Sequence, residues 1–185
     1  MDPNPPLLRE ETALEVLESR KKYVDAVVIT GGEPTIHKDL PMFLRKLKER
    51  GFAVKLDTNG FYPEVLEESL PSLDYVALDV KTSFKKYARL GAEDVAPLLR
   101  TIEMLKTGKV EYEFRTTVVP SFVDREDLIA LGEIVTGAEN FALQQFNPED
   151  TLDKACKTVK PYSGETITEF SETMKKYAGK IIIRA

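Results

Sequence analysis

Short apolar runs alternate with longer amphipathic stretches along the whole chain. The apolar runs predict strands over 26–30, 52–56, 75–80, 112–119, 141–145 and 180–184. Apolar residues at helical spacing predict helices over 10–21, 39–51, 63–70, 95–106, 127–135 and 166–177. We expect Asp39 to cap the second of these helices and Gly51 to end it.

Strands that alternate with helices imply β-α-β crossovers and therefore a parallel sheet. No linker or low-complexity segment divides the chain, so residues 1–185 are expected to form a single α/β domain. Five or six strands are too few for a complete eight-fold barrel, which needs about 250 residues. The alternatives are a doubly wound open sheet and a partial barrel, and in both of them ligands bind at the carboxyl ends of the strands.

Composition narrows the classes of partner. The formal net charge is −5 and the pI is about 5.2, which argues against a nucleic-acid-binding protein with a basic face. No apolar run approaches the roughly 20 residues that a membrane span needs. Residues 1–6 are acidic and proline-rich, the reverse of a secretory signal. We therefore expect a cytoplasmic protein that binds neither nucleic acid nor membrane.

Cysteine and histidine each occur once, as Cys156 and His37. An intramolecular disulfide is impossible, and so is a zinc site of the usual Cys/His kind. The chain by itself also lacks the thiolates that hold a 4Fe–4S cluster. We expect Cys156 to be an isolated thiol and His37 to be solvated or structural.

Polar clusters follow five of the predicted strands, and all of them are expected at one rim of the sheet. They are Gly31-Gly32-Glu33-Pro34, Asp57-Thr58-Asn59-Gly60, Asp79 with Lys81, Arg115 with Thr116 and Thr117, and Gln144, Gln145 and Asn147. Each cluster alone has a structural explanation: a tight turn, an Asx turn, a surface ion pair or a partly buried cation. Together they suit a zwitterionic ligand, because Arg115 can grip a carboxylate with two hydrogen bonds. Oxygens of Asp57, Thr58 and Asp79 could also form a site for a hard cation.

The same residues resemble the radical S-adenosylmethionine (SAM) superfamily. Gly31-Gly32-Glu33-Pro34 after an apolar strand matches the GGEP motif of that family. The segments 56–61, 73–81, 114–120 and 143–153 resemble the branch that activates glycyl radical enzymes, which includes pyruvate formate-lyase activase and anaerobic ribonucleotide reductase activating proteins. The resemblance covers essentially the whole chain and implies a partial (β/α)6 barrel.

The resemblance also implies roles for the rim residues. The SAM-binding set is Gly31, Gly32, Glu33 and Pro34 of the GGEP motif, with Asp57, Thr58, Asn59, Lys81, Arg115, Gln145 and Asn147. Gly31, Gly32 and Glu33 would contact the amino group of SAM, and Lys81 and Arg115 would position it. Asn147 falls roughly where some relatives place a SAM-contacting histidine. Asp57, Thr58, Asp79 and the carbonyl of Ala77 would bind a monovalent cation, Na⁺ or K⁺, that also contacts the SAM carboxylate.

One feature of the family is absent from these residues. The CxxxCxxC loop that holds the 4Fe–4S cluster, and the strand before it, have no counterpart in the sequence. In the family this cluster cleaves SAM reductively, and the resulting 5′-deoxyadenosyl radical removes a glycine hydrogen from the partner. We therefore expect a chain shortened by cloning, by a misplaced start codon or by natural splitting, and inactive by itself.

The resemblance implies a radical SAM activating enzyme whose partners are an electron donor and a glycyl radical enzyme. Such a partner would be an anaerobic ribonucleotide reductase or a pyruvate formate-lyase-like protein. The alternatives are a non-catalytic SAM- or nucleotide-binding module, a subunit of a split enzyme that borrows its cluster, and an unrelated α/β protein that binds a small molecule.

Overall fold

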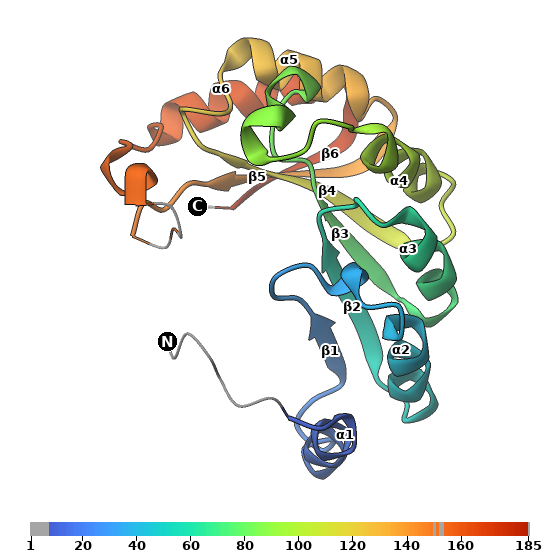
Figure 1. The fold of residues 1–185 in the computed structure, drawn as a ribbon. Coiled ribbons are helices and arrows are strands. Elements are labelled where there is room, and N and C mark those ends of the chain that lie inside the picture. Colours follow the sequence, from blue (N-terminus) through green and yellow to red (C-terminus); the bar gives the residue numbers. More distant parts are fainter. Residues whose placement is uncertain (1–7, 150, 152–153, 185) are drawn as a thin grey trace.

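The computed structural model describes residues 8–149, 151 and 154–184. Its strands form one parallel sheet in the order β1-β2-β3-β4-β5-β6 (Figure 1). The strands are β1 (Ala26–Ile29), β2 (Ala53–Thr58), β3 (Tyr75–Asp79), β4 (Glu111–Val118), β5 (Ala138–Gln145) and β6 (Ala178–Arg184). The helices are α1 (Glu10–Ser19), α2 (Leu40–Glu49), α3 (Pro63–Ser69), α4 (Ala96–Lys106), α5 (Arg125–Ile134) and α6 (Gly164–Met174). The predicted alternation of strands and helices is confirmed.

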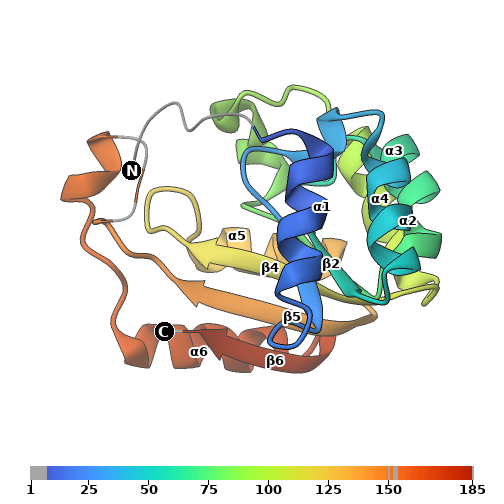
Figure 2. The same ribbon diagram turned by 90° about the horizontal axis from the view of Figure 1, so that it is seen from below.

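The strand order decides between the two architectures that the sequence left open. Each strand pairs with its neighbour in the sequence, and every pairing is parallel. Right-handed crossovers between sequential strands place their helices on one face of the sheet, whereas a doubly wound sheet reverses its order and is covered on both faces. Figures 1 and 2 show the helices following the outer curve of the sheet, from α2 beside β2 to α6 beside β6. The fold is therefore the partial barrel.

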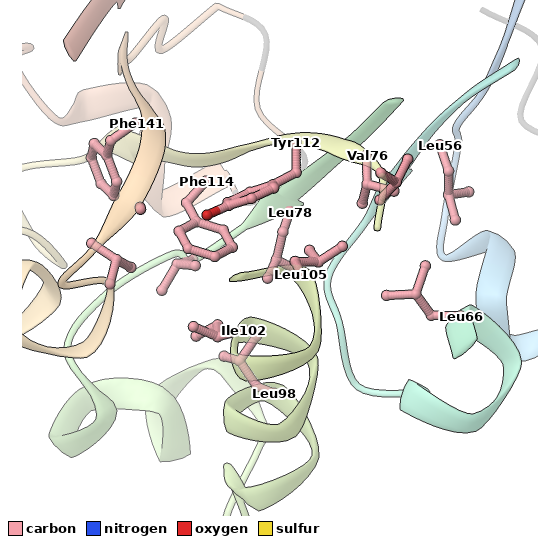
Figure 3. Packing of buried hydrophobic residues seen from close by; sticks show 14 of the residues in the cluster. Leu56, Leu66, Val76, Leu78, Leu98, Ile102, Leu105, Tyr112, Phe114 and Phe141 are labelled. Carbon is pink, nitrogen blue, oxygen red and sulfur yellow. The ribbon is translucent and has the colours of Figure 1, made fainter. Parts of the chain in front are cut away.

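The outer face of the sheet supplies the hydrophobic core. Leu56, Val76, Leu78, Tyr112 and Phe114 alternate along three strands and are almost completely buried. Figure 3 shows them facing Leu66 of α3 and Leu98, Ile102 and Leu105 of α4. Burial of such side chains contributes about 1.5–3 kcal/mol each. This packing holds the strand ends, and with them the rim, in a fixed arrangement.

The inner, concave face of the sheet is polar. Lys55, Asp57, Asp79, Glu113 and Arg115 alternate with the core residues along β2, β3 and β4 and are buried or half-buried. Because a strand directs successive side chains to opposite faces, a sequence that looks continuously apolar still carries a polar row. This row leads to the carboxyl ends of the strands.

Local details differ from the sequence-based expectations at several helix ends. Asp39 occupies the N-cap position of α2, as predicted, but its backbone is already helical and its side chain makes no capping hydrogen bond. Gly51 ends α2 with φ of 76°, as predicted. The helix predicted over 127–135 begins at Arg125, because Asp124 forms a reciprocal capping box with Asp127.

The longest described helices, α4 and α6, have 11 residues each, and no helix in the described ranges is long and apolar enough to cross a bilayer. The N-terminal segment 1–6 and the positions Leu152 and Asp153 lie outside the described residues.

Candidate functional site

The carboxyl ends of β1 to β4 surround one cavity of about 120 Å³. Its lining consists of Thr30, Gly31, Gly32, Glu33, Asp57, Thr58, Asn59, Asp79, Lys81 and Arg115. These residues come from four loops or strand ends spread over about half of the sequence, and the parallel register brings them to one rim. The structure thus gathers most of the residues that the sequence analysis placed there.

The glycines of the first loop leave their backbone open to the cavity. Gly31 has φ of 102°, a conformation that favours glycine over any residue with a Cβ. No heavy atom lies within 4 Å of the position that a Cβ would take at Gly31 or Gly32. A ligand can therefore approach this backbone closely.

Glu33 ties this loop to the end of β2. Its Oε1 accepts hydrogen bonds from the Thr35 amide (3.1 Å), the Thr35 hydroxyl (2.5 Å) and the Thr58 hydroxyl (2.7 Å). Its Oε2 accepts a hydrogen bond from the Asn59 amide at 2.7 Å. A carboxylate offers about four acceptor positions, so most of this capacity is already used within the protein. The backbone of Gly31 and Gly32, more than the Glu33 carboxylate, faces a ligand.

Replacing Glu33 by Gln is expected to lower the free energy of unfolding by about 2 kcal/mol, because one acceptor oxygen becomes an amide that cannot accept a hydrogen bond. Urea unfolding measures this loss. The matched control is Glu49→Gln on the exposed side of α2, which should change stability by less than about 0.5 kcal/mol. Equal effects of the two substitutions would contradict the tie between the two loops.

A row of charges crosses the floor of the cavity. Arg115 donates from Nε to Asp79 Oδ1 at 2.6 Å and from Nη1 to Asp57 Oδ2 at 3.1 Å. Lys81 Nζ donates to Asp79 Oδ2 at 3.0 Å, and Lys55 Nζ lies 3.1 Å from Asp57 Oδ1. The side chains of Arg115 and Asp57 are only 14% and 17% exposed, so these interactions are poorly screened by water.

The charges of this row support one another. Burial by itself raises the pKa of Asp79, but hydrogen bonds and charges from Arg115 and Lys81 outweigh it and hold that pKa below its usual value. Burial lowers the pKa of Arg115, and the bonds to Asp79 and Asp57 more than reverse this effect. Asp79 and Arg115 are therefore both ionised at neutral pH.

Lys81 is held at the rim by a residue that the sequence analysis did not single out. The backbone N–H of Lys81 donates to the hydroxyl of buried Tyr87 at 2.8 Å. Burial and the charge of Asp79 raise the pKa of Tyr87 to about 12, although the bond from Lys81 opposes the rise, so the phenol stays neutral. The side chain of Lys81 remains 52% exposed and accessible to a ligand while its Nζ also donates to Asp79.

The residues predicted to bind a monovalent cation differ in whether their oxygens already have hydrogen-bond partners. Asp57 Oδ1 is buried and receives no hydrogen bond, since the nearby Lys55 ammonium is not aligned with it. Ala77 lies beside Asp57 in the register of β2 and β3. Thr58, in contrast, donates its hydroxyl to Glu33. Asp57 Oδ1 therefore lacks a hydrogen bond but already faces the charge of Lys55 at 3.1 Å, and the Thr58 hydroxyl is engaged by Glu33.

Three residues of the predicted SAM-binding set, Pro34, Gln145 and Asn147, lie away from the lining of this cavity. Gln145 donates from its side chain to the carbonyl of Tyr162 at 3.1 Å, on the opposite face of β5 from Gln144. Asn147 is exposed and its side chain accepts a hydrogen bond from the Glu149 amide at 3.1 Å. Pro34 is the buried first residue of a 3₁₀ turn. With exposed His37 it lines a larger cavity of about 540 Å³ beside α1 and α2, which shares Gly31, Gly32 and Glu33 with the first cavity.

An apolar cavity adjoins the charged row and was not predicted. It has a volume of about 200 Å³ and shares Asp79, Lys81 and Arg115 with the first cavity. The other lining residues are Leu90, Thr117, Val119, Phe122, Phe146, Thr151 and Cys156. Hydrophobic residues of loops gave no periodic signal in the sequence, so only the tertiary structure reveals this wall.

The side chains present exclude one cofactor, a thiolate-bound 4Fe–4S cluster. A 4Fe–4S cluster bound through thiolates does not fit these 185 residues, because Cys156 is their single cysteine. Within the described ranges, no three His, Cys, Asp or Glu side chains are grouped as metal ligands.

Comparisons with a protein-family model and with individual proteins all match this chain to radical SAM proteins and their relatives. A model of the Radical SAM superfamily matches residues 1–132. A protein of Methanocaldococcus jannaschii named "Putative glycyl-radical enzyme activating enzyme MJ1227" is 39% identical over 171 residues, which cover 88% of this chain and 71% of that protein. The pyruvate formate-lyase-activating enzyme of Staphylococcus aureus is 29% identical over 153 residues, covering 75% of this chain and 61% of that enzyme.

Among solved structures, Streptococcus suis SuiB bound to its precursor peptide SuiA superposes with a TM-score of 0.71 at 13% identity. The match covers 98% of this chain and 43% of SuiB. At this identity the similarity concerns the fold alone, and it agrees with the partial barrel.

Proposed function

Because the chain belongs to the radical SAM superfamily, we propose that its rim cavity binds SAM through the methionine end of that molecule. The observation that carries this proposal is the arrangement of Arg115 and Lys81 opposite the open backbone of Gly31 and Gly32 in one small cavity. A cationic pair facing free backbone groups suits a ligand that carries a carboxylate and an amino group on the same carbon.

Each part of the ligand has a matching part of the site. The SAM carboxylate would meet Lys81, which is half exposed, and Arg115. The amino group would donate to backbone carbonyls of the Gly31-Gly32 segment, whose surroundings are open. The adenosine would enter the adjoining apolar cavity, in which aromatic Phe122 and Phe146 provide surface for a purine.

We also propose that Asp57 and Asp79 bind Na⁺ or K⁺ beside the SAM carboxylate, since Asp57 Oδ1 is buried without a hydrogen bond. Asp57→Ala is then expected to weaken SAM binding about tenfold in potassium buffer and much less in choline buffer. Isothermal calorimetry in the two buffers measures the difference, with Glu49→Ala as a control on the exposed side of α2. An equal loss in both buffers would assign the effect to Arg115, which loses a partner, and would contradict the cation site.

The finer function follows from the relatives. We propose that the working protein activates a glycyl radical enzyme, a role supported by the similarity to activating enzymes over 88% and 75% of this chain. In such an enzyme SAM supplies the 5′-deoxyadenosyl group as the radical that abstracts hydrogen. The residues described here bind and orient SAM; the thiolates of a cluster have to come from outside these 185 residues.

The single cysteine favours a second candidate, a SAM-binding module or a subunit that borrows its cluster. The deciding experiment has two stages. Calorimetry with SAM tests the binding site, and absence of binding in both sodium and potassium buffers would refute it. Anaerobic reconstitution with iron and sulfide, followed by electron paramagnetic resonance of the reduced sample, then separates the candidates. We expect no cluster signal from this chain alone.

The partner class is tested by mixing the purified chain with an anaerobic ribonucleotide reductase and, separately, with a pyruvate formate-lyase-type protein. Binding that is selective for one of them supports a glycyl radical enzyme as the partner. Binding to neither, together with intact SAM affinity, would favour the module.

A further inference from the structure

A second ion pair, between a buried carboxylate and a partly exposed guanidinium, lies on the concave face below the candidate site. Glu113 of β4 is buried, with a side chain that is 1% exposed. Arg184, near the end of β6, reaches across β5 and grips it with two hydrogen bonds, Nη1 to Oε1 at 2.7 Å and Nη2 to Oε2 at 2.6 Å. This fork-to-fork geometry is the strongest form of carboxylate recognition by arginine. Burial and then the neighbouring charge of Glu113 raise the pKa of Tyr75 on β3 to about 12.

Glu113 and Arg115 are near neighbours on this face. They are two residues apart in β4, so their side chains point the same way with Cα atoms roughly 6.6–7 Å apart. Hydrogen bonding to Glu113 raises the pKa of Arg184, while the positive charge of Arg115 opposes the rise. The two guanidinium groups are therefore close enough to repel each other.

A buried carboxylate that loses its cation is costly, because its charge is left unpaired where water is scarce. If Arg184 were absent, Glu113 would compete for the nearest guanidinium, which is that of Arg115 on the same strand and face. Lys55 is a weaker competitor, because it lies against Asp57 and over the ring of Tyr75 at 5.8 Å. If Arg115 turned toward Glu113, it would lose its hydrogen bonds to Asp57 and Asp79 and would no longer lie at the rim cavity.

We infer that Arg184 is a positioning residue: by saturating Glu113 it leaves Arg115 free to bridge Asp57 and Asp79 and to receive the ligand carboxylate. Arg184 itself is absent from the lining of both rim cavities, so it acts through Glu113 and Arg115. The link to SAM rests on the function proposed above, whereas the effect on Arg115 does not.

The first measurement needs no ligand. The Arg115 Nε–H signal in the nitrogen-15 NMR spectrum, identified by its loss in Arg115→Met, reports the short bond to Asp79. We expect this signal to shift in Arg184→Gln and to return in the double variant Arg184→Gln/Glu113→Gln, which removes the competing charge. A signal that stays in place in Arg184→Gln, or that does not return in the double variant, would overturn the inference.

The second measurement is calorimetry with SAM and with decarboxylated SAM, which lacks only the carboxylate. Arg184→Gln should weaken SAM binding about tenfold and leave the decarboxylated ligand within about twofold, and the double variant should restore SAM binding. A purely structural role for Arg184 would weaken both ligands equally and would not be rescued by Glu113→Gln. Either of those results would contradict the inference.

A more conservative change guards against misfolding. Arg184→Lys keeps one positive charge on Glu113 but loses the fork, so we expect about a threefold loss of SAM affinity that Glu113→Gln cancels. Native affinity in a folded Arg184→Lys protein, together with an unmoved Arg115 signal, would refute the inference. If the unaltered chain binds neither ligand, the proposed function fails and the NMR signal alone decides the role of Arg184.

Discussion

Replacing Arg115 by Met is expected to lower the free energy of unfolding by about 3 kcal/mol and to weaken SAM binding by about 100-fold or more. The guanidinium joins two carboxylates, Asp57 and Asp79, and all three side chains are less than one-third exposed. Methionine keeps most of the length and removes the charge and both hydrogen bonds. The two carboxylates then face each other with only Lys55 and Lys81 to offset them.

Arg100 provides a matched control. It also bridges two carboxylates, Glu64 at 2.5 Å and Glu67 at 3.0 Å, but its side chain is 51% exposed. Because exposed ion pairs contribute little, Arg100→Met should cost less than about 1 kcal/mol and leave SAM binding unchanged. Thermal unfolding and calorimetry of both variants measure the contrast. If the two variants lose the same stability, the charged row at the rim is not the buried network described here.

Gly60→Ala is expected to lower the free energy of unfolding by about 2–4 kcal/mol. Gly60 has φ of 79°, and a Cβ there would lie 2.5 Å from Leu78 Cδ1 and 3.0 Å from Leu98 Cδ1. Both leucines are fully buried, so neither can move aside cheaply. The Gly60 carbonyl also accepts a hydrogen bond from the Thr101 hydroxyl at 2.8 Å, which fixes the turn against α4.

Gly91→Ala is the control that separates the steric clash expected in Gly60→Ala from the backbone strain that both substitutions share. Gly91 has φ of 86°, but no heavy atom lies within 4 Å of the position that a Cβ would take there. Its substitution should cost only the strain of a left-handed residue, about 1–2 kcal/mol. Urea unfolding of both variants gives the difference. A Gly91 variant as unstable as the Gly60 variant would show that packing against Leu78 and Leu98 contributes nothing.

Sequence and structure agree best at the strand ends. Parallel strands carry their carboxyl ends to one rim whatever the details of packing, so Gly31, Asp57, Asp79 and Arg115 could be assigned to one site from their order alone. Gln145 could not be assigned in this way. Whether a residue at a strand end faces inward depends on the phase of the alternation, and an apolar run such as 141–145 does not reveal its phase.

Glu33 illustrates a second limit. The motif marks it as a site residue, and it does line the cavity, but its donors come from Thr35 and from Thr58 and Asn59, which are 25 and 26 residues away. A sequence gives the number of acceptors that a carboxylate has, but not how many the fold itself uses. Only the placement of the two loops decides that.

The sequence by itself determined the alternation of six strands and helices, the rim at their carboxyl ends and the family resemblance, because these depend on short-range periodicity and on the order of motifs. The tertiary structure decided that the sheet is a sequential partial barrel, and that Arg115 lies between Asp57 and Asp79. It also decided that Arg184 holds Glu113 from 71 residues away. These outcomes depend on sheet curvature and register, which set distances between strands that no local pattern encodes.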